Sequence, residues 1–266
     1  MLIKRRSIEK EASQRKSSSK NRRIKFAPIT LSESSGIRYL HFGTEWIQGA
    51  MRMSKPNQLV LSYSHKMVAW MLFNQHPKII AHLGLGSASL TKFCYTEYPD
   101  SVTHVAEINP EVIAVCHSMF ALPPDNDRLN VHLMDAFDFV SESQYIGAFD
   151  IMHVDLYDAE SLGPVLSSPE FYTNCHQCLK DDGIMAVNLF GELPSYDKNI
   201  QAIKRSFIEV VPLSPVPEGN VIVLAFKKKP KMNWTVWDDE ANRIKEKTGL
   251  PTRQWIKDLK RIWKDD

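Results

Sequence analysis

An alternation of short apolar runs with helix-type segments fills residues 79–226 of this chain. The apolar runs are typical of strands buried on both faces, and the segments between them carry the spacing of helices. Strands that alternate with helices form a parallel sheet covered on both faces. The sequence therefore predicts an α/β fold with a mostly parallel sheet and an antiparallel last strand. The expected strands are 79–83, 102–108, 129–134, 149–155, 183–189, 208–213 and 220–226, and the expected helices are 89–98, 110–119, 169–179 and 200–207.

Residues that suit a nucleoside follow the first three expected strands. Gly84-Leu85-Gly86-Ser87-Ala88-Ser89 joins the first strand to a helix, where small residues admit a close ligand and the helix N-terminus offers free N–H groups. Glu107 ends the second strand roughly 20 residues later, the usual place of an acid that binds ribose hydroxyls. Asp135-Ala136 ends the third strand, where an adenine ring would lie. Tight strand–helix packing would explain the glycines alone, but the order of all these residues favours a nucleoside site.

Two acids follow the fourth expected strand, in the sequence Asp155-Leu156-Tyr157-Asp158. Ligands of such sheets bind beyond the carboxyl ends of the strands, so both acids are expected to face the nucleoside crevice. A carboxylate pair there can hold a cationic amine and accept its proton. A loop cap or a surface acid pair is the alternative interpretation.

The chain divides into four expected parts. Residues 1–35 are basic and Ser-rich with few large apolar side chains, which predicts a disordered tail, with contact to nucleic acid as the less favoured alternative. Residues 36–76 predict a small β-hairpin unit that includes a strand at 59–61 and ends in a helix at 63–73. Residues 77–230 form the expected nucleoside-binding catalytic domain, and residues 231–266 a basic helical tail.

Composition and cysteine content limit the partners, the metal sites and the cellular compartment that can be expected for this chain. The formal net charge is +2, which creates no overall field toward nucleic acid or membrane, and no apolar stretch is long enough to span a bilayer. Of the four cysteines, Cys175 and Cys178 form a C-x-x-C, but no second ligand pair accompanies them, so no metal site is expected. Without a secretory signal or a disulfide framework, a cytoplasmic protein that makes no membrane contact is expected.

The order of these motifs resembles the spermidine synthase family, the polyamine aminopropyltransferases, from about Arg38 to Lys227. The family opens with a small β-domain that has a Gly-x-x-x-Gln-like turn and then a Tyr-His-Glu motif, of which this chain keeps the tyrosine. The matching segments, in chain order, are Gly43 to Gln48, Tyr63-Ser64-His65, Gly84 to Ser89, Glu107 in Ala-Glu-Ile-Asn-Pro, Asp135-Ala136, Asp155 to Asp158, Gly163-Pro164, Phe171-Tyr172 and Gly183-Ile184.

The resemblance implies a Rossmann-like fold of the S-adenosylmethionine-dependent methyltransferase type. It also implies transfer of an aminopropyl group from decarboxylated S-adenosylmethionine to a small amine such as putrescine, with no tightly bound cofactor. Asp155 would accept the proton of the attacking amine, and Asp158 and Tyr63 would orient that amine. A homo-oligomer, most simply a dimer, is implied as well. The nucleoside contacts implied by the resemblance are Gln48, Gly84, Gly86, Ser87, Glu107, Asp135 and Ala136.

Three positions depart from the family pattern. Ser87 stands where the family carries an aspartate that binds the donor's amine and would repel the carboxylate of ordinary S-adenosylmethionine. Val216 replaces a tyrosine that lines the acceptor pocket, and Asn188 replaces a glutamine after the fifth strand.

These departures leave two alternatives. One is a methyltransferase that uses S-adenosylmethionine, against which stands His82, because methyltransferases prefer an acid two residues before the glycine loop. The other is a non-catalytic member that binds a nucleoside or a partner protein, against which stands the retention of Asp155 and Asp158.

Overall fold

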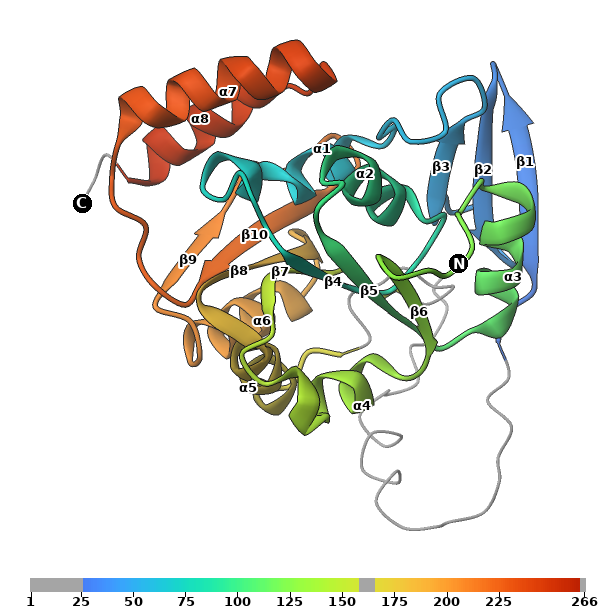
Figure 1. Cartoon of the computed structure of the whole chain (residues 1–266), viewed down its shortest axis with the longest axis horizontal. Coiled ribbons are helices and arrows are strands. Elements are labelled where there is room, and N and C mark those ends of the chain that lie inside the picture. The colour runs from blue at the N-terminus through green and yellow to red at the C-terminus, as the bar shows by residue number, and fades with distance from the viewer. Residues whose placement is uncertain (1–25, 158–165, 264–266) are drawn as a thin grey trace, which may run out of the picture.

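A seven-stranded sheet forms the centre of the computed structural model, which describes residues 26–157 and 166–263 (Figure 1). The strand order is β6-β5-β4-β7-β8-β10-β9, and β10 runs antiparallel to both of its neighbours. This confirms the predicted α/β fold with a mostly parallel sheet. The strands are β4 (Ile79–Leu83), β5 (Val102–Glu107), β6 (Leu129–Leu133), β7 (Phe149–Val154), β8 (Leu179–Phe190), β9 (Glu209–Pro212) and β10 (Asn220–Phe226).

Helices cover both faces of this sheet with separate apolar clusters. One cluster joins the sheet to α1, η3, α2, α7 and α8, and the other joins it to α4, α5 and α6. Burial on both faces explains why the central strands are almost continuously apolar. The helices are α1 (Ser62–Met67), η3 (Ala69–Leu72), α2 (Ser89–Glu97), α3 (Pro110–Met119), α4 (Ala136–Ser141), η4 (Ser143–Tyr145), α5 (Pro169–Cys178), α6 (Ser195–Lys204), α7 (Trp234–Thr248) and α8 (Thr252–Ile262).

The N-terminal unit is a three-stranded antiparallel sheet, in the order β1 (Ile29–Ser34), β2 (Ile37–Phe42) and β3 (Gly49–Arg52). Strand β1 lies inside the segment expected to be a disordered tail, because Ile29 and Phe42 pack in one apolar cluster with Leu40 and Phe120. Residues 1–25 of that expected tail lie outside the described residues. The strand expected at 59–61 is wrong, since this segment leads directly into α1.

Three other boundaries differ from the sequence-based expectation. The single helix expected over 63–73 is two helices, because Val68 leaves helical geometry (φ −99°, ψ 13°) between α1 and η3. Strand β8 begins at Leu179, directly after α5, and shifts its register against β7 between Phe149 and Ile151. Helix α6 begins five residues before the expected start, just after Pro194, a residue common at helix starts.

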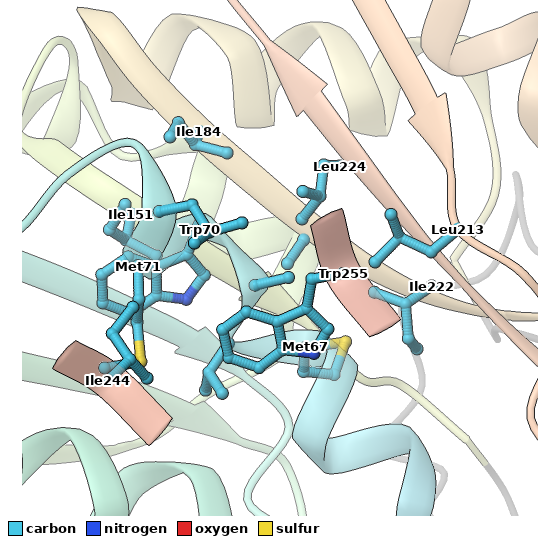
Figure 2. Packing of buried hydrophobic residues seen from close by; sticks show 14 of the residues in the cluster. Met67, Trp70, Met71, Ile151, Ile184, Leu213, Ile222, Leu224, Ile244 and Trp255 are labelled. Carbon is cyan, nitrogen blue, oxygen red and sulfur yellow. The ribbon is translucent and has the colours of Figure 1, made fainter. Parts of the chain in front are cut away.

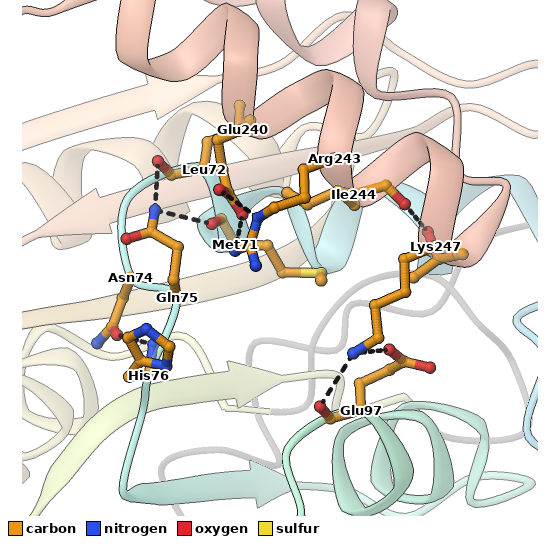
Figure 3. A network of polar contacts seen from close by, with 11 residues as sticks. Met71, Leu72, Asn74, Gln75, His76, Glu97, Glu240, Arg243, Ile244 and Lys247 are labelled. Carbon is orange, nitrogen blue, oxygen red and sulfur yellow. Dashed lines mark hydrogen bonds and ion pairs between the residues drawn. The ribbon is translucent and has the colours of Figure 1, made fainter.

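Helices α7 and α8 lie side by side against the sheet, at the upper left of Figure 1. The indole of Trp255 on α8 is fully buried in the cluster that contains Met67, Leu213 and Ile222 (Figure 2). At the far end of α7, Lys247 pairs with Glu97 of α2 at 2.8 Å (Figure 3). In the described part of the chain, no helix combines the length and apolar character that crossing a membrane requires.

Candidate active site

The glycine loop turns tightly between β4 and α2. Gly84 has a φ of +93°, which favours glycine, and a Cβ at this position would overlap the backbone oxygen of Asp155. Gly86 also has a positive φ, of +53°. The loop therefore lies directly against the residue that follows β7, and the sequence motifs after two adjacent strands meet at the carboxyl edge of the sheet.

Glu107 binds the same loop. Its Oε2 accepts a hydrogen bond from the Leu85 N–H at 3.0 Å, and its Oε1 accepts one from the Asn109 N–H at 2.8 Å. Burial raises the pKa of this carboxyl, while the backbone hydrogen bonds oppose that rise. Each oxygen of the Glu107 carboxylate can accept a further hydrogen bond, so the two oxygens can still accept hydrogen bonds from two hydroxyl groups of a ribose.

Asp135 caps helix α4, with Oδ1 accepting from the Phe137 N–H at 2.7 Å. Ala136 is buried at the start of that helix. The end of β6 is tied to the end of β5 through the Met134 N–H, which donates to the Glu107 carbonyl at 3.0 Å. Asp135-Ala136 is thus held beside Glu107 on the same edge of the sheet, and cap formation alone also accounts for Asp135.

Asp155 is half-buried, and each of its carboxylate oxygens receives a side-chain hydrogen bond. The Tyr63 hydroxyl donates to Oδ2 at 3.1 Å, and the Asn188 amide donates to Oδ1 at 2.9 Å. Burial raises the pKa of Asp155, and these two hydrogen bonds limit the rise. Burial and the adjacent Asp155 charge raise the pKa of Tyr63 well above its ordinary value, which keeps its hydroxyl protonated as a donor.

A second amide fixes the orientation of the first. The Asn220 side chain donates to Oδ1 of Asn188 at 2.9 Å, so the Asn188 NH₂ group must face Asp155. The Tyr157 hydroxyl donates to the backbone carbonyl of Asn188 at 2.8 Å. Sequence reasoning noted Asn188 only as a departure from the family and missed Asn220 altogether. The pairing of Asn220 in β10 with Phe190 of β8 brings these two amides together. This pairing could not be predicted from any local sequence motif.

Gln48, Tyr63, Ser87 and Asp155 line one narrow pocket with the glycine loop. Its volume is about 20 Å³, roughly enough for one water molecule. The Ser87 hydroxyl lies 2.9 Å from that of Ser89, and a Cβ on Gly49 would overlap Ser87. The enclosed space is therefore much smaller than a nucleoside.

The structure brings most of the predicted site residues to one edge of the sheet, at the ends of β4, β5, β6 and β7 and at the start of α1. Asp158, the second acid of the predicted pair, lies outside the described residues, as do Gly163 and Pro164. Its predicted role therefore stays a prediction.

Within the described ranges, one group of side chains offers metal-type ligands, namely His82, Cys94 and His153. All three are buried, but the two imidazoles stack with ring centroids 4.7 Å apart and planes inclined by only 25°. Imidazole lone pairs lie in the ring plane, so those of two stacked rings do not converge on one ion. Nε2 of His153 also accepts a hydrogen bond from the Trp70 indole at 2.8 Å. This arrangement suits a neutral core pair better than a metal site.

Comparison with known proteins assigns the family. The model of the spermine/spermidine synthase domain matches residues 96–232, about half of the chain. The chain belongs to the spermine/spermidine synthase family. This confirms the family resemblance. The matched residues include Glu107, Asp135 and Asp155.

Individual relatives agree over most of the chain. A polyamine aminopropyltransferase of Chromobacterium violaceum is 32% identical over 87% of this chain and 89% of its own length. A probable spermidine synthase of Corynebacterium glutamicum has a similar structure, with a TM-score of 0.67 and 19% identity over 86% of this chain and 90% of that one. Human methyltransferase-like protein 13, solved with SAH, has a TM-score of 0.63 and 21% identity over 72% of this chain and 94% of that one. These two structures show the fold alone, and the fold is shared with methyltransferases.

Proposed function

We propose that this chain is a polyamine aminopropyltransferase, which moves an aminopropyl group from decarboxylated S-adenosylmethionine to an amine acceptor. The observation that carries the proposal is the Asp155 carboxylate, held between Tyr63 and Asn188 against the glycine loop. This arrangement suits a general base beside a nucleoside site, in a chain of the spermine/spermidine synthase family with a relative named polyamine aminopropyltransferase.

In the proposed reaction, the acceptor nitrogen attacks the carbon next to the donor's sulfonium. A C–N bond forms, the C–S bond breaks, and its electron pair returns to sulfur, so that methylthioadenosine leaves as a neutral thioether. Asp155 takes the proton that the nitrogen loses. The raised pKa of Asp155 brings this base closer to neutral pH, which improves its match to proton transfer.

The nucleoside half of the donor is assigned to the ends of β4, β5 and β6. Glu107 would accept the ribose hydroxyls, Asp135-Ala136 would flank the adenine, and the Gly84–Ser87 turn would lie under the sulfonium end. Gln48, which lines the narrow pocket with Ser87, would contact the nucleoside from the N-terminal unit.

The acceptor side is assigned to Tyr63 and to the segment between β9 and β10. Ser62 donates a hydrogen bond to Glu218 of that segment at 3.3 Å, which places a carboxylate next to α1. Glu218 would hold the far ammonium of a diamine, two residues after Val216, which stands where the family has a tyrosine. Asp158 would help to orient the reacting amine.

We further propose a dimeric, cytoplasmic protein. Its four cysteines are free and buried, as is usual for proteins of a reducing compartment. Light scattering of the purified full chain measures the oligomeric state, and a monomer at all working concentrations would contradict the dimer.

The proposed function is tested by incubating the full chain with a donor and putrescine and detecting methylthioadenosine and spermidine by mass spectrometry. Calorimetric titration with decarboxylated S-adenosylmethionine, S-adenosylmethionine and methylthioadenosine identifies the donor. Product formation with tighter binding of the decarboxylated donor supports the proposal. Tighter binding of S-adenosylmethionine, with methyl transfer instead, identifies a methyltransferase, and binding of none of the three identifies a member that has lost its ligand.

A further inference from the structure

A buried ion pair joins the last helix of the chain to the helix that carries Tyr63. Lys66 of α1 and Asp258 of α8 lie 2.8 Å apart from Nζ to Oδ2, and their side chains are only 8% and 2% exposed. The two residues are 192 positions apart in the sequence. Helix α8 lies outside the residues that match the family domain, 96–232.

The same pair holds a third segment. Lys66 also donates to the Ser214 carbonyl at 2.6 Å, while Asp258 accepts from the Ser214 N–H at 3.1 Å and from the Ser214 hydroxyl. Ser214 lies between β9 and β10, in the segment that also carries Glu218. The ion pair thus binds both proposed walls of the acceptor site, α1 and the segment 213–219.

Asp258 is well satisfied for a buried carboxylate. Gln254 donates to it at 3.1 Å in addition to Lys66 and Ser214. Burial by itself would raise the pKa of Asp258, but hydrogen bonds from Lys66 and Ser214 lower it overall, so the carboxylate is charged at neutral pH. Removing one member of such a pair leaves an uncompensated buried charge, which is strongly unfavourable.

Helix α1 depends on contacts of this kind. It has only six residues, and it follows Leu61, whose side chain offers no hydrogen-bonding cap. Isolated helices of this length are unstable in water, because too few hydrogen bonds offset the cost of starting the helix. Its position is therefore set by its tertiary contacts, which include the Lys66–Asp258 pair and the buried Met67, a member of the same apolar cluster as Trp255 (Figure 2).

We propose that Asp258 is a positioning residue for aminopropyl transfer: through Lys66 and Ser214, helix α8 sets the place of Tyr63 and Glu218 relative to Asp155. This inference rests on the proposed function. It assigns to the C-terminal helices a role in acceptor binding, whereas the nucleoside contacts at the ends of β4, β5 and β6 stay independent of them.

The test compares Asp258→Asn with the double variant Lys66→Met/Asp258→Leu in the full chain. The first keeps the shape and removes the charge, and the second removes both charges, which a buried site often tolerates without loss of stability. The matched control is Asp238→Asn, which removes the more exposed Lys260–Asp238 pair on the same two helices.

We expect both test variants to lose between about 10- and 100-fold in kcat/KM for the amine, because small misplacements of orienting groups have effects of that size. Methylthioadenosine binding by calorimetry should change less than about twofold, and the control should behave as the unchanged protein. Hydrogen exchange should speed up in residues 62–67 and 213–219 but not in 79–91.

The inference is overturned if the double variant is folded and shows unchanged exchange in 62–67 and 213–219, or if the affinity for methylthioadenosine falls as far as kcat/KM for the amine. Should Asp258→Asn fail to fold, the double variant decides the question. Should the unchanged protein transfer no aminopropyl group, the proposed function fails, while hydrogen exchange still decides whether α8 positions α1.

Discussion

The Tyr63 hydroxyl lies 3.1 Å from Oδ2 of Asp155, and it donates a hydrogen bond across 92 positions of sequence. Tyr63 belongs to a short helix before the central sheet, and Asp155 follows the fourth strand of that sheet. Asn188 occupies the other carboxylate oxygen at 2.9 Å. The carboxylate is therefore fixed in orientation by two donors, which is what a base needs if it is to meet one proton at one place.

Replacement of the proposed base tests the proposed chemistry. Asp155→Asn should reduce kcat between about 10²- and 10⁴-fold, the usual contribution of a general base. Methylthioadenosine should still bind, because the proposed nucleoside contacts lie on other strands. Steady-state kinetics and calorimetry measure the two effects, and near-normal turnover would show that another group takes the proton.

Loss of the tyrosine hydroxyl should change the pH dependence of the reaction. Tyr63→Phe removes a hydrogen bond that lowers the pKa of Asp155, so this pKa should rise. Because the base must be deprotonated, the acid limb of the kcat profile should move to higher pH. Tyr95→Phe is the control, since the Tyr95 hydroxyl contacts Asn126 instead. If the acid limb of the kcat profile does not move in Tyr63→Phe, this hydroxyl does not control the pKa of the base.

The amide pair can be reversed by one substitution. Asn220→Asp exchanges the donor that faces Asn188 for an acceptor, so the Asn188 amide should turn and present its oxygen to Asp155. The pKa of Asp155 should then rise, with an acid limb shifted to higher pH than that of the unchanged protein. Asn199→Asp is a matched buried control, because Asn199 contacts Tyr172 and Ser195. A lower rate without a shifted limb would point to general damage.

A methyl group on Gly84 should disrupt the site and the fold together. Alanine is strained at a φ of +93°, and its Cβ would overlap the Asp155 carbonyl. We expect Gly84→Ala to lower the free energy of unfolding by more than about 2 kcal/mol. Gly147→Ala is the control, since its φ of +64° brings the strain but nothing lies within 4 Å of the added Cβ. Urea unfolding compares the two, and equal losses would exclude the steric overlap.

The buried imidazole pair should make stability depend on pH. Burial lowers the pKa of His153 from 6.5 to about 3, and burial also lowers the pKa of His82. Below the unfolded pKa, the unfolded chain binds more protons than the folded one, so their contribution to stability is complete above about pH 6.5 and is lost as pH falls toward 3.

Between pH 7.5 and 5.5, the free energy of unfolding should therefore fall by roughly 1 kcal/mol through His153, and His82 should add to the fall in the same direction. Urea unfolding at the two pH values measures the change. His153→Asn should reduce it, whereas replacement of the exposed His76 by Gln should leave it as it is. A pH dependence that His153→Asn does not alter would assign the effect to other groups.

Several elements were predictable because their signals are local. The expected strand at 79–83, the helix at 110–119 and the strand at 220–226 agree with β4, α3 and β10 at both ends. An apolar run bounded by turn residues, or a proline after Asn109, specifies such elements within a few residues. Strand β1 was missed because it has no such local signal. Its residues 30–34 are exposed, so they form no apolar run, and only the pairing with β2 makes the segment a strand.

The sequence by itself determined the alternating α/β core, the order of the motifs at the strand ends and the family to which they point. Only the tertiary structure decided the surroundings of Asp155. The partners Tyr63, Asn188 and Asn220, and the tie from Asp258 to Lys66, lie in segments far apart along the chain. Their side chains meet because the sheet register and the docking of α8 bring the segments together, and buried polar groups must then satisfy one another. Neither the docking of these segments nor the pairing of their buried polar groups can be predicted from a local sequence pattern.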